Sequence, residues 1–121
     1  MFRMNRELPK RGEIWRIDFR DALGSEPNKI RPGIVVNSDD TGVLPVRLVV
    51  PLTTRQPQHE SYEWIVEVPP TYTNGLTQIS SADPMLMSSA SLRRFKEQIG
   101  TLGPAILAAI EDALTFVLDL P

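Results

Sequence analysis

Two short apolar runs decide the fold of this chain: residues 33–36 read GIVV and residues 46–50 read VRLVV. Both runs are brief and rich in β-branched residues, which favours strands over helices. Arg31-Pro32 stands directly before the first run, and PLTTR, residues 51–55, directly follows the second. The sequence therefore places an arginine at the start of one expected strand and two hydroxyls at the end of the next.

The flanking segments predict further strands. Residues 13–19 read EIWRIDF, in which apolar and polar residues alternate, so we expect a half-buried strand there. Residues 62–68 alternate in the same way, and Pro69-Pro70 ends that pattern. Loops or turns are expected at residues 20–32, 38–42 and 55–61, which are rich in Gly, Ser, Pro, Asn, Gln and charged residues.

The second half of the chain is less regular. Residues 76–79, 85–87 and 98–102 predict strands, whereas residues 80–84 predict an irregular segment and residues 91–95 a short helix. One longer helix is expected at the C-terminal end, because proline is well tolerated at a first helical position and Gly103-Pro104 supplies it. An apolar stripe with three- to four-residue spacing predicts the face that this helix buries: Leu107, Ile110, Leu114, Val117 and Leu118.

These elements together predict a mainly β fold with a C-terminal α-helix. The chain has 11 prolines, mostly at the ends of apolar runs, so we expect short strands curved into a small barrel-like sheet. A length of 121 residues with 41% hydrophobic content suits one domain with its own core. We therefore expect a single domain over residues 1–121, with residues 1–10 as a flexible N-terminal segment.

Composition excludes several classes of protein. The chain has no cysteine, which rules out disulfides and thiolate metal sites. No apolar stretch approaches the roughly 18–20 residues that span a bilayer, and no signal peptide is recognisable, so we expect a cytoplasmic protein. The net charge of −2 does not suit a broad nucleic-acid-binding face. Ten of the 13 Lys and Arg lie in residues 1–60, so an anion site should be a local pocket built there.

Arg31 and Thr53 are the strongest candidates for chemistry. A guanidinium fork and a nearby hydroxyl suit a phosphodiester that gains charge during cleavage, which points to RNA cleavage without a metal ion. Each residue also has a simpler interpretation: Arg31 as a surface partner of Glu26, and Thr53 as a hydroxyl bonded to nearby backbone. His59 is the only histidine and cannot hold a metal alone, so an exposed loop residue is its simplest interpretation.

Four short blocks add a more specific signal. They are RGEIW at residues 11–15, GSE at 24–26 with Arg31-Pro32 after it, VPLTT at 50–54, and IGTL at 99–102 before an apolar helix. Each block alone is weak, but the four stand in this order across nearly the whole chain. A chain with this arrangement resembles the MazF/PemK toxin family of bacterial toxin–antitoxin pairs.

The resemblance implies an SH3-like barrel of the MazF/Kid/CcdB type that forms a homodimer. It implies a ribosome-independent, sequence-selective endoribonuclease that cuts single-stranded RNA without metal or other cofactor, leaving 2′,3′-cyclic phosphate and 5′-hydroxyl ends. A cognate MazE-like antitoxin would neutralise it. Arg31 matches the family's catalytic arginine and Thr53 its catalytic threonine, which leaves open whether Arg31 is a charge clamp, a general acid or a general base. RNA-binding residues are expected nearby: Glu26, Lys29, Thr54, Arg55 and His59.

The chain also departs from parts of the family. Relatives of the Kid/PemK branch carry an Arg-x-Asp pair after the strand near residue 80, where this chain reads MLMS at residues 85–88. Met85, Leu86 and Met87 are instead expected as core or dimer-interface residues. A non-catalytic toxin on the same fold, like the gyrase poison CcdB, is the alternative. That relative depends on an aromatic C-terminal tail, whereas residues 117–121 read VLDLP.

Overall fold

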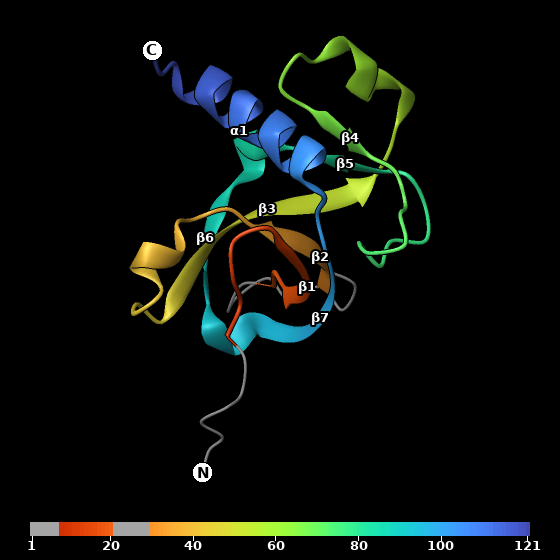
Figure 1. Ribbon diagram of the computed structural model, residues 1–121. Coiled ribbons are helices and arrows are strands. Elements are labelled where there is room, and N and C mark those ends of the chain that lie inside the picture. The colour runs from red at the N-terminus through yellow and green to blue at the C-terminus, as the bar shows by residue number, and fades with distance from the viewer. Residues whose placement is uncertain (1–7, 21–29) are drawn as a thin grey trace.

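The computed structural model describes residues 8–20 and 30–121. This part of the chain holds seven strands and one α-helix, with short 3-10 helices between them (Figure 1). The strands are β1 (Glu13–Asp18), β2 (Ile30–Val35), β3 (Val46–Thr54), β4 (Val66–Val68), β5 (Ser80–Ala82), β6 (Ser88–Ser91) and β7 (Phe95–Thr101). The helices are η1 (Asp39–Thr41), η2 (Pro57–Ser61), η3 (Pro84–Leu86), η4 (Leu92–Arg94) and α1 (Pro104–Leu118).

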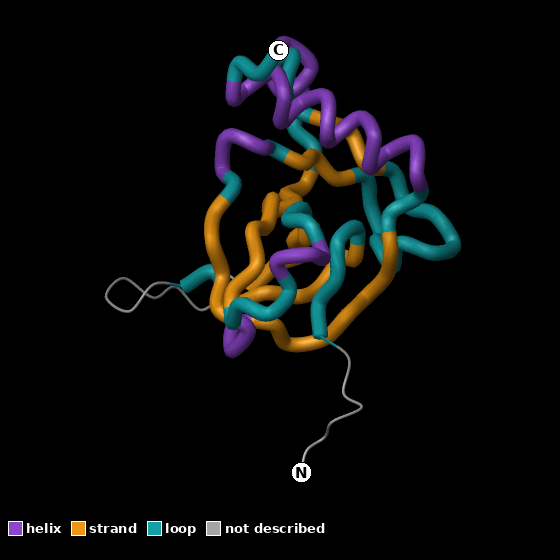
Figure 2. Tube along the Cα trace, turned by 60° about the vertical axis from the view of Figure 1, so that its left-hand side comes forward, coloured by secondary structure: helices purple, strands orange, loops and turns teal. Residues whose placement is uncertain are grey.

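The strands form one curled antiparallel sheet. Their order is β4-β5-β3-β2-β1-β7, and β6 pairs with β3 outside this path. Within the described residues no pairing joins β4 to β7, so the sheet curves round its core without closing, and α1 lies across one end (Figure 2). The expectation of a mainly β, barrel-like fold with a C-terminal helix is therefore confirmed, with an open sheet.

Strand β3 is the centre of this sheet. At its middle, Val49 pairs with Val35 of β2 and with Ser88 of β6, so β3 has partners on both edges. Its last three residues, Leu52–Thr54, pair with β5 instead of β6. The C-terminal end of β3 therefore lies between β5 and the beginning of β2.

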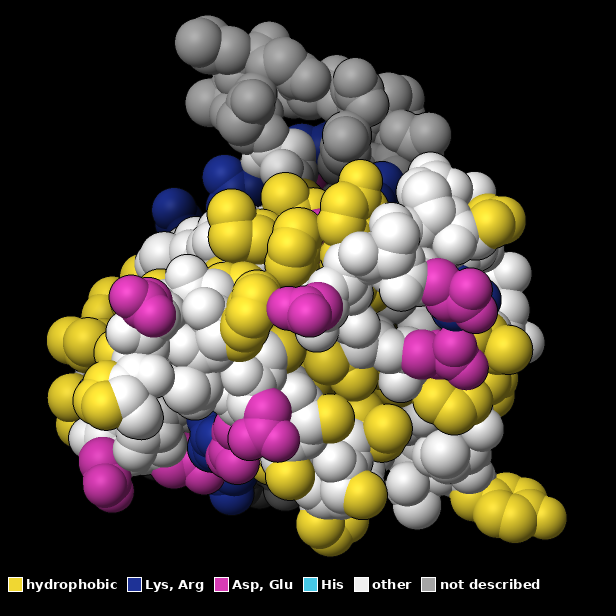
Figure 3. All heavy atoms as spheres, turned by 90° about the horizontal axis from the view of Figure 1, so that it is seen from above, with side chains coloured by type: hydrophobic (Ala, Val, Ile, Leu, Met, Phe, Trp, Pro, Cys, Tyr) yellow, Lys and Arg dark blue, Asp and Glu magenta, His cyan; other side chains and the backbone are white. Residues whose placement is uncertain are grey.

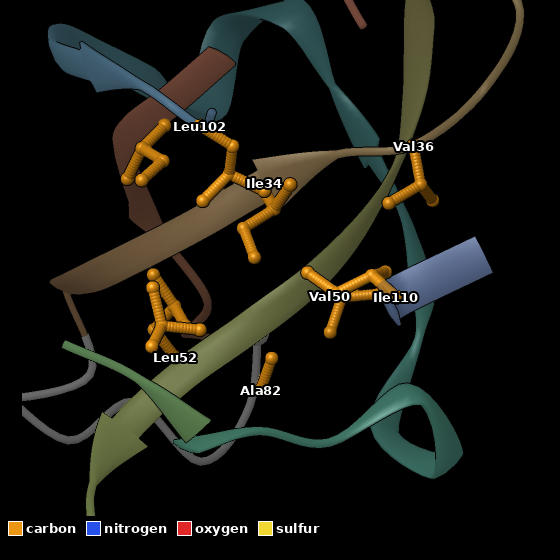
Figure 4. Close-up of a cluster of buried hydrophobic side chains, with 9 residues drawn as sticks. Ile34, Val36, Val50, Leu52, Ala82, Leu102 and Ile110 are labelled. Atoms are coloured by element: carbon orange, nitrogen blue, oxygen red, sulfur yellow. The ribbon is translucent and has the colours of Figure 1, made fainter. Parts of the chain in front are cut away.

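Side chains alternate across the sheet between two apolar clusters. Ile34 and Val50 face the larger cluster, which α1 covers through Ile110 (Figure 4). The intervening residues, Val35 and Val49, face a smaller cluster on the opposite side of the sheet. Because consecutive strand residues point to opposite faces, the apolar runs at residues 33–36 and 46–50 contribute side chains to both clusters.

Helix α1 begins with proline at its first position, as expected, and ends at Asp119 in the left-handed conformation (φ 56°). Ile110 and Ala113 are buried, and Leu114 packs against the larger cluster. Leu118 is 53% exposed, so the expected apolar stripe does not extend to it. No helix in the described ranges is long and apolar enough to cross a membrane.

The strand predicted over residues 62–68 is wrong in its first half. Only β4, Val66–Val68, is extended and paired. The Trp64 ring instead stacks on Phe116 of α1, with centroids 6.4 Å apart and planes at 13°, and Tyr62 packs against Trp64 at 5.0 Å. Aromatic packing against the helix outweighs the local alternation.

Residues 76–87 also differ from the sequence prediction. No strand forms over 76–79, whereas β5 forms inside the stretch predicted to be irregular. The strand predicted at residues 85–87 is wrong, because η3 turns there. Asp83 caps this turn by accepting a hydrogen bond at Oδ1 from the Met85 N–H (3.0 Å).

Candidate active site

A cavity opens where β2 and β3 separate. Their pairing covers three residues on each strand and ends at Gly33 opposite Pro51. Proline has no N–H to donate, and Pro32, just beyond the last pair, is the β2 residue whose N–H would point to β3, so the ladder loses a donor there. Continuing the same register by two residues places Arg31 opposite Thr53. Arg31 therefore lies within β2. The sequence had instead placed it directly before the expected strand.

Arg31 and Thr53 both line this cavity, which has a volume of about 280 Å³. Both side chains are half-buried, so they are ordered by packing and still reachable from solvent. Arg31 is the one charged residue among the described residues of the lining. The others are Pro32, Leu52, Thr54, Leu76, Thr77, Gln78 and Ser80.

The far wall of the cavity, which begins at Leu76, is held by Asn74. This side chain is 2% exposed. Its Oδ1 accepts hydrogen bonds from the N–H groups of Thr71 and Leu76 (3.0 Å each), and its Nδ2 donates to the Pro69 carbonyl (2.8 Å). Gly100 of β7 lets the loop approach, because a Cβ there would lie 2.3 Å from the Asn74 backbone. The loop that closes the cavity thus packs directly against β7.

The beginning of β2 lies beside charged groups at the end of β1 and in η4. Ile30 of β2 pairs with Asp18. Arg20 binds the Asp18 carboxylate through two hydrogen bonds, Nε to Oδ1 (2.8 Å) and Nη2 to Oδ2 (2.6 Å), and this contact holds the pKa of Asp18 well below its usual range. Arg94 donates to the backbone carbonyls of Asp18 (2.9 Å) and Arg20. The strand end beside Arg31 is therefore fixed from β1 and η4.

Arg55 lies just past the end of β3, between two carboxylates. Its Nε is 2.9 Å from Glu67 Oε1, and its Nη2 is 3.3 Å from Glu60 Oε2. These three residues line a second cavity of about 310 Å³. Arg55 is thus not a free cation at the mouth of the first cavity.

His59 is engaged in the wall of the same second cavity. Its Nδ1 accepts a hydrogen bond from the Gln56 N–H (3.1 Å) and lies 2.7 Å from Ser81 Oγ, whose hydroxyl donates to it. Ser81 is 1% exposed. The loop predicted at residues 55–61 therefore forms the ordered turn η2, pinned to β5 through His59.

One row of cross-strand neighbours connects the two cavities. Thr53 pairs with Ser81 of β5, and Ser81 pairs with Glu67 of β4. Directly opposed residues of antiparallel strands point to the same face, so Arg31, Thr53, Ser81 and Glu67 form a continuous polar row. Sequence reasoning missed Ser81 and Glu67, since nothing local marks a serine in an irregular-looking stretch or a glutamate on a short edge strand.

The remaining predicted site residues fall into two groups. Thr54 lines the first cavity, and its Oγ1 is a 3.5 Å acceptor for Gln78 Nε2. Glu26 and Lys29 lie outside the described residues. Over residues 8–20 and 30–121, no three His, Cys, Asp or Glu side chains are grouped so that they could share a metal ion.

Comparison with known proteins assigns a family to most of the chain. The model of the PemK-like, MazF-like toxins of type II toxin–antitoxin systems matches residues 10–118. The chain is 32% identical over 119 residues to Endoribonuclease MazF9 of Mycobacterium tuberculosis, covering 93% of this chain and 98% of that protein.

Solved structures share the fold. MazF from Deinococcus radiodurans superposes with a TM-score of 0.75 at 22% identity, over 95% of this chain and all (100%) of that one. An endoribonuclease from a mycobacterial species, solved in complex with its cognate antitoxin, gives a TM-score of 0.74 at 22% identity, over 93% of this chain and 97% of that one.

Asn74→Ala should destabilise the protein, because the N–H groups of Thr71 and Leu76 lose the buried side-chain acceptor that holds this loop. We expect a loss of about 1–3 kcal/mol in the free energy of unfolding, measured by urea denaturation. Tyr72→Ala, at a fully exposed position of the same loop, is the control and should be near neutral. Equal stability of the two variants would show that Asn74 does not hold this wall.

Proposed function

This chain belongs to the family of PemK-like, MazF-like toxins of type II toxin–antitoxin systems, and we propose that its Arg31 cavity cleaves single-stranded RNA without a metal ion. The protein is an endoribonuclease toxin by this membership. We propose that it acts independently of the ribosome and selects short sequence motifs. The observation that carries the chemistry is the register that brings Arg31 and Thr53 to opposite sides of one cavity.

The proposed reaction needs no group beyond the RNA and these side chains. The 2′-oxygen attacks the adjacent phosphorus, and the bond from phosphorus to the 5′-oxygen breaks. The 2′-hydroxyl loses its proton and the departing 5′-oxygen gains one, which leaves a 2′,3′-cyclic phosphate and a 5′-hydroxyl. Negative charge grows on the non-bridging oxygens between these two events, so donors fixed at that point lower the barrier.

We propose that Arg31 stabilises this growing negative charge and that Thr53 donates a hydrogen bond to a non-bridging oxygen. A guanidinium is planar, keeps its proton and offers paired donors to phosphate oxygens, so charge stabilisation is its natural task. No carboxylate among the described lining residues competes for Arg31. Proton donation to the 5′-oxygen by the same fork is compatible with this role.

RNA on either side of the cut would contact the residues around the cavity. Thr54 lines the cavity itself, while Arg55 and His59 line the second cavity, at the other end of the polar row. We propose that these three bind the strand, together with Glu26 and Lys29 outside the described part. The antitoxin, a MazE-like protein, would inhibit by laying an acidic segment over Arg31.

We propose that the active toxin is a homodimer formed around η3 and α1, which pack against each other. Figure 3 views the molecule from the α1 side, where hydrophobic side chains lie exposed between separated acidic groups. Met85 and Leu86 are 61% and 55% exposed, whereas Met87 packs against the core. Because η3 directly follows β5, this surface adjoins the polar row. We propose further that residues 1–121 form a single domain that acts in the cytoplasm.

Pure protein should cut a long single-stranded RNA in excess chelator. Mass spectrometry and end-labelling should find 2′,3′-cyclic phosphate and 5′-hydroxyl ends on the fragments. Cleavage that appears only when magnesium is added, or fragments with 5′-phosphate ends, would rule out the proposed chemistry. A folded protein that poisons cells without cutting any RNA would favour a contact-only toxin.

Arg31→Ala should lower the cleavage rate by roughly 100- to 1,000-fold, the usual cost of one transition-state donor. Arg31→Lys should also fail, because a point charge does not reproduce the planar fork. Arg93→Ala removes an exposed arginine from η4 and serves as the matched control, with cleavage near wild type. A fast Arg31→Lys enzyme would show that only charge matters, and a fast Arg31→Ala enzyme would remove Arg31 from the mechanism.

Leu86→Asp should lower both the dimer fraction and RNA cleavage, because it places a charge in an apolar interface. Light scattering at micromolar concentration should report about twice the monomer mass of 13.6 kDa for the wild type. Val43→Asp, at a 91% exposed position in the turn before β3, is the control and should remain dimeric. A Leu86→Asp monomer that cleaves at the wild-type rate would show that dimerisation is dispensable.

A further inference from the structure

The second cavity, beside the Arg31 cavity, has the features of a ligand site. Its volume of about 310 Å³ exceeds the space that a single nucleobase fills. Arg55, Glu60, Glu67, His59, Ser81 and Tyr62 contribute to its lining. It combines charged groups, a buried hydroxyl and an aromatic ring.

The charge of this cavity argues against a second phosphate. Arg55 is its one cation among the described residues, and it already contacts Glu67 and Glu60 at 2.9 and 3.3 Å. One cation and two carboxylates leave a net charge of −1, so an incoming phosphate would displace a carboxylate and meet its repulsion. A neutral ligand with hydrogen-bond donors meets no such penalty.

The polar atoms of these side chains that have no described partner indicate which hydrogen-bonding groups the ligand should present. Glu67 uses Oε1 and Glu60 uses Oε2 for Arg55, and the other oxygen of each has no partner among the described residues. Arg55 likewise keeps Nη1 without a described partner. The cavity thus offers two acceptors beside one donor. Among the four RNA bases, guanine alone presents two adjacent N–H donors beside a carbonyl, at N1, N2 and O6.

Tyr62 supplies a face on which a base can stack. It is 43% exposed and lines the cavity. Trp64 backs its ring at 5.0 Å, and Trp64 in turn stacks on Phe116 of α1. Unstacked bases of single-stranded RNA bind on such aromatic side chains while their Watson–Crick edges are read by hydrogen bonds. This packing also explains why residues 62–64 leave the sheet.

We propose that this cavity reads a guanine base close to the scissile phosphate, with Glu60 and Glu67 accepting from N1–H and N2–H and Arg55 donating to O6. The inference rests on the proposed function, because it takes the scissile phosphate to lie at Arg31. Ser81 is two strands away from Arg31 in the polar row, about 10 Å at the usual strand spacing. The guanine therefore belongs to a nucleotide next to the cut or one removed from it.

The first experiment maps the cleavage motif of the wild type. Sequencing of 5′-hydroxyl ends from a long RNA should find guanine required at one position, either next to the cut or one nucleotide removed from it. In Glu60→Gln and Glu67→Gln, which replace an acceptor by an amide of the same size, the preference for guanine at that position should fall by about tenfold or more. Glu63→Gln, an exposed glutamate outside this cavity, is the matched control and should keep the motif. A motif without guanine would overturn the inference.

The second experiment does not require cleavage. Fluorescence anisotropy would compare the binding of uridine-rich oligonucleotides that carry one central guanine or inosine, which lacks the 2-amino group. The wild type should lose about tenfold in affinity with inosine, and at least one of the two glutamine variants should lose little. A purely structural role for the glutamates would leave the inosine penalty unchanged, and that result would also overturn the inference. Guanine-dependent binding without RNA cleavage would refute the proposed function and leave the guanine site standing.

Discussion

The short pairing between β2 and β3 is the constraint on which the rest of the site depends. The two strands hold together for only three residues on each side, from Val35–Val49 to Gly33–Pro51. Beyond that point Pro32 offers no N–H to the ladder, so the strands separate while their register persists. Separation creates a cavity, and register decides that Arg31 and Thr53 face each other across it. A longer ladder would fill this space with backbone hydrogen bonds.

The other walls exist because distant segments are brought to the same opening. Strand β3 carries β2 on one edge and β5 on the other, so its last residues have neighbours from two regions of the sequence. The loop that begins at Leu76 is fixed to β7 through Asn74 and Gly100, and the turn η2 is fixed to β5 through His59 and Ser81. Rigid elements thus surround a half-open cavity, as a preorganised site requires.

Sequence reasoning succeeded where local pattern and tertiary structure agree. The apolar runs at residues 33–36 and 46–50 predicted β2 and β3, and Gly103-Pro104 with the stripe after it predicted α1. It failed where packing between distant residues decides. Residues 62–65 alternate like a strand, but Trp64 finds a better partner in Phe116. The sequence around residues 80–82 does not predict a strand, yet these residues become extended because they pair with the edge of β3. Ser81 and Glu67 enter the polar row by register alone, which no single segment reveals.

On the proposed function, the placement of charge would let a mildly acidic protein hold RNA in one register. Among the described residues of the two cavities, Arg31 has no carboxylate in its lining, whereas Arg55 is held by two. A phosphate is therefore drawn to Arg31 and turned away from Arg55, while a base with donors on its edge has the opposite preference. If both arginines were free, a phosphodiester could settle at either, and the cut would lose its position relative to the sequence. On the proposed function, Glu60 and Glu67 would contribute to selectivity by making the neighbouring cavity unfit for phosphate.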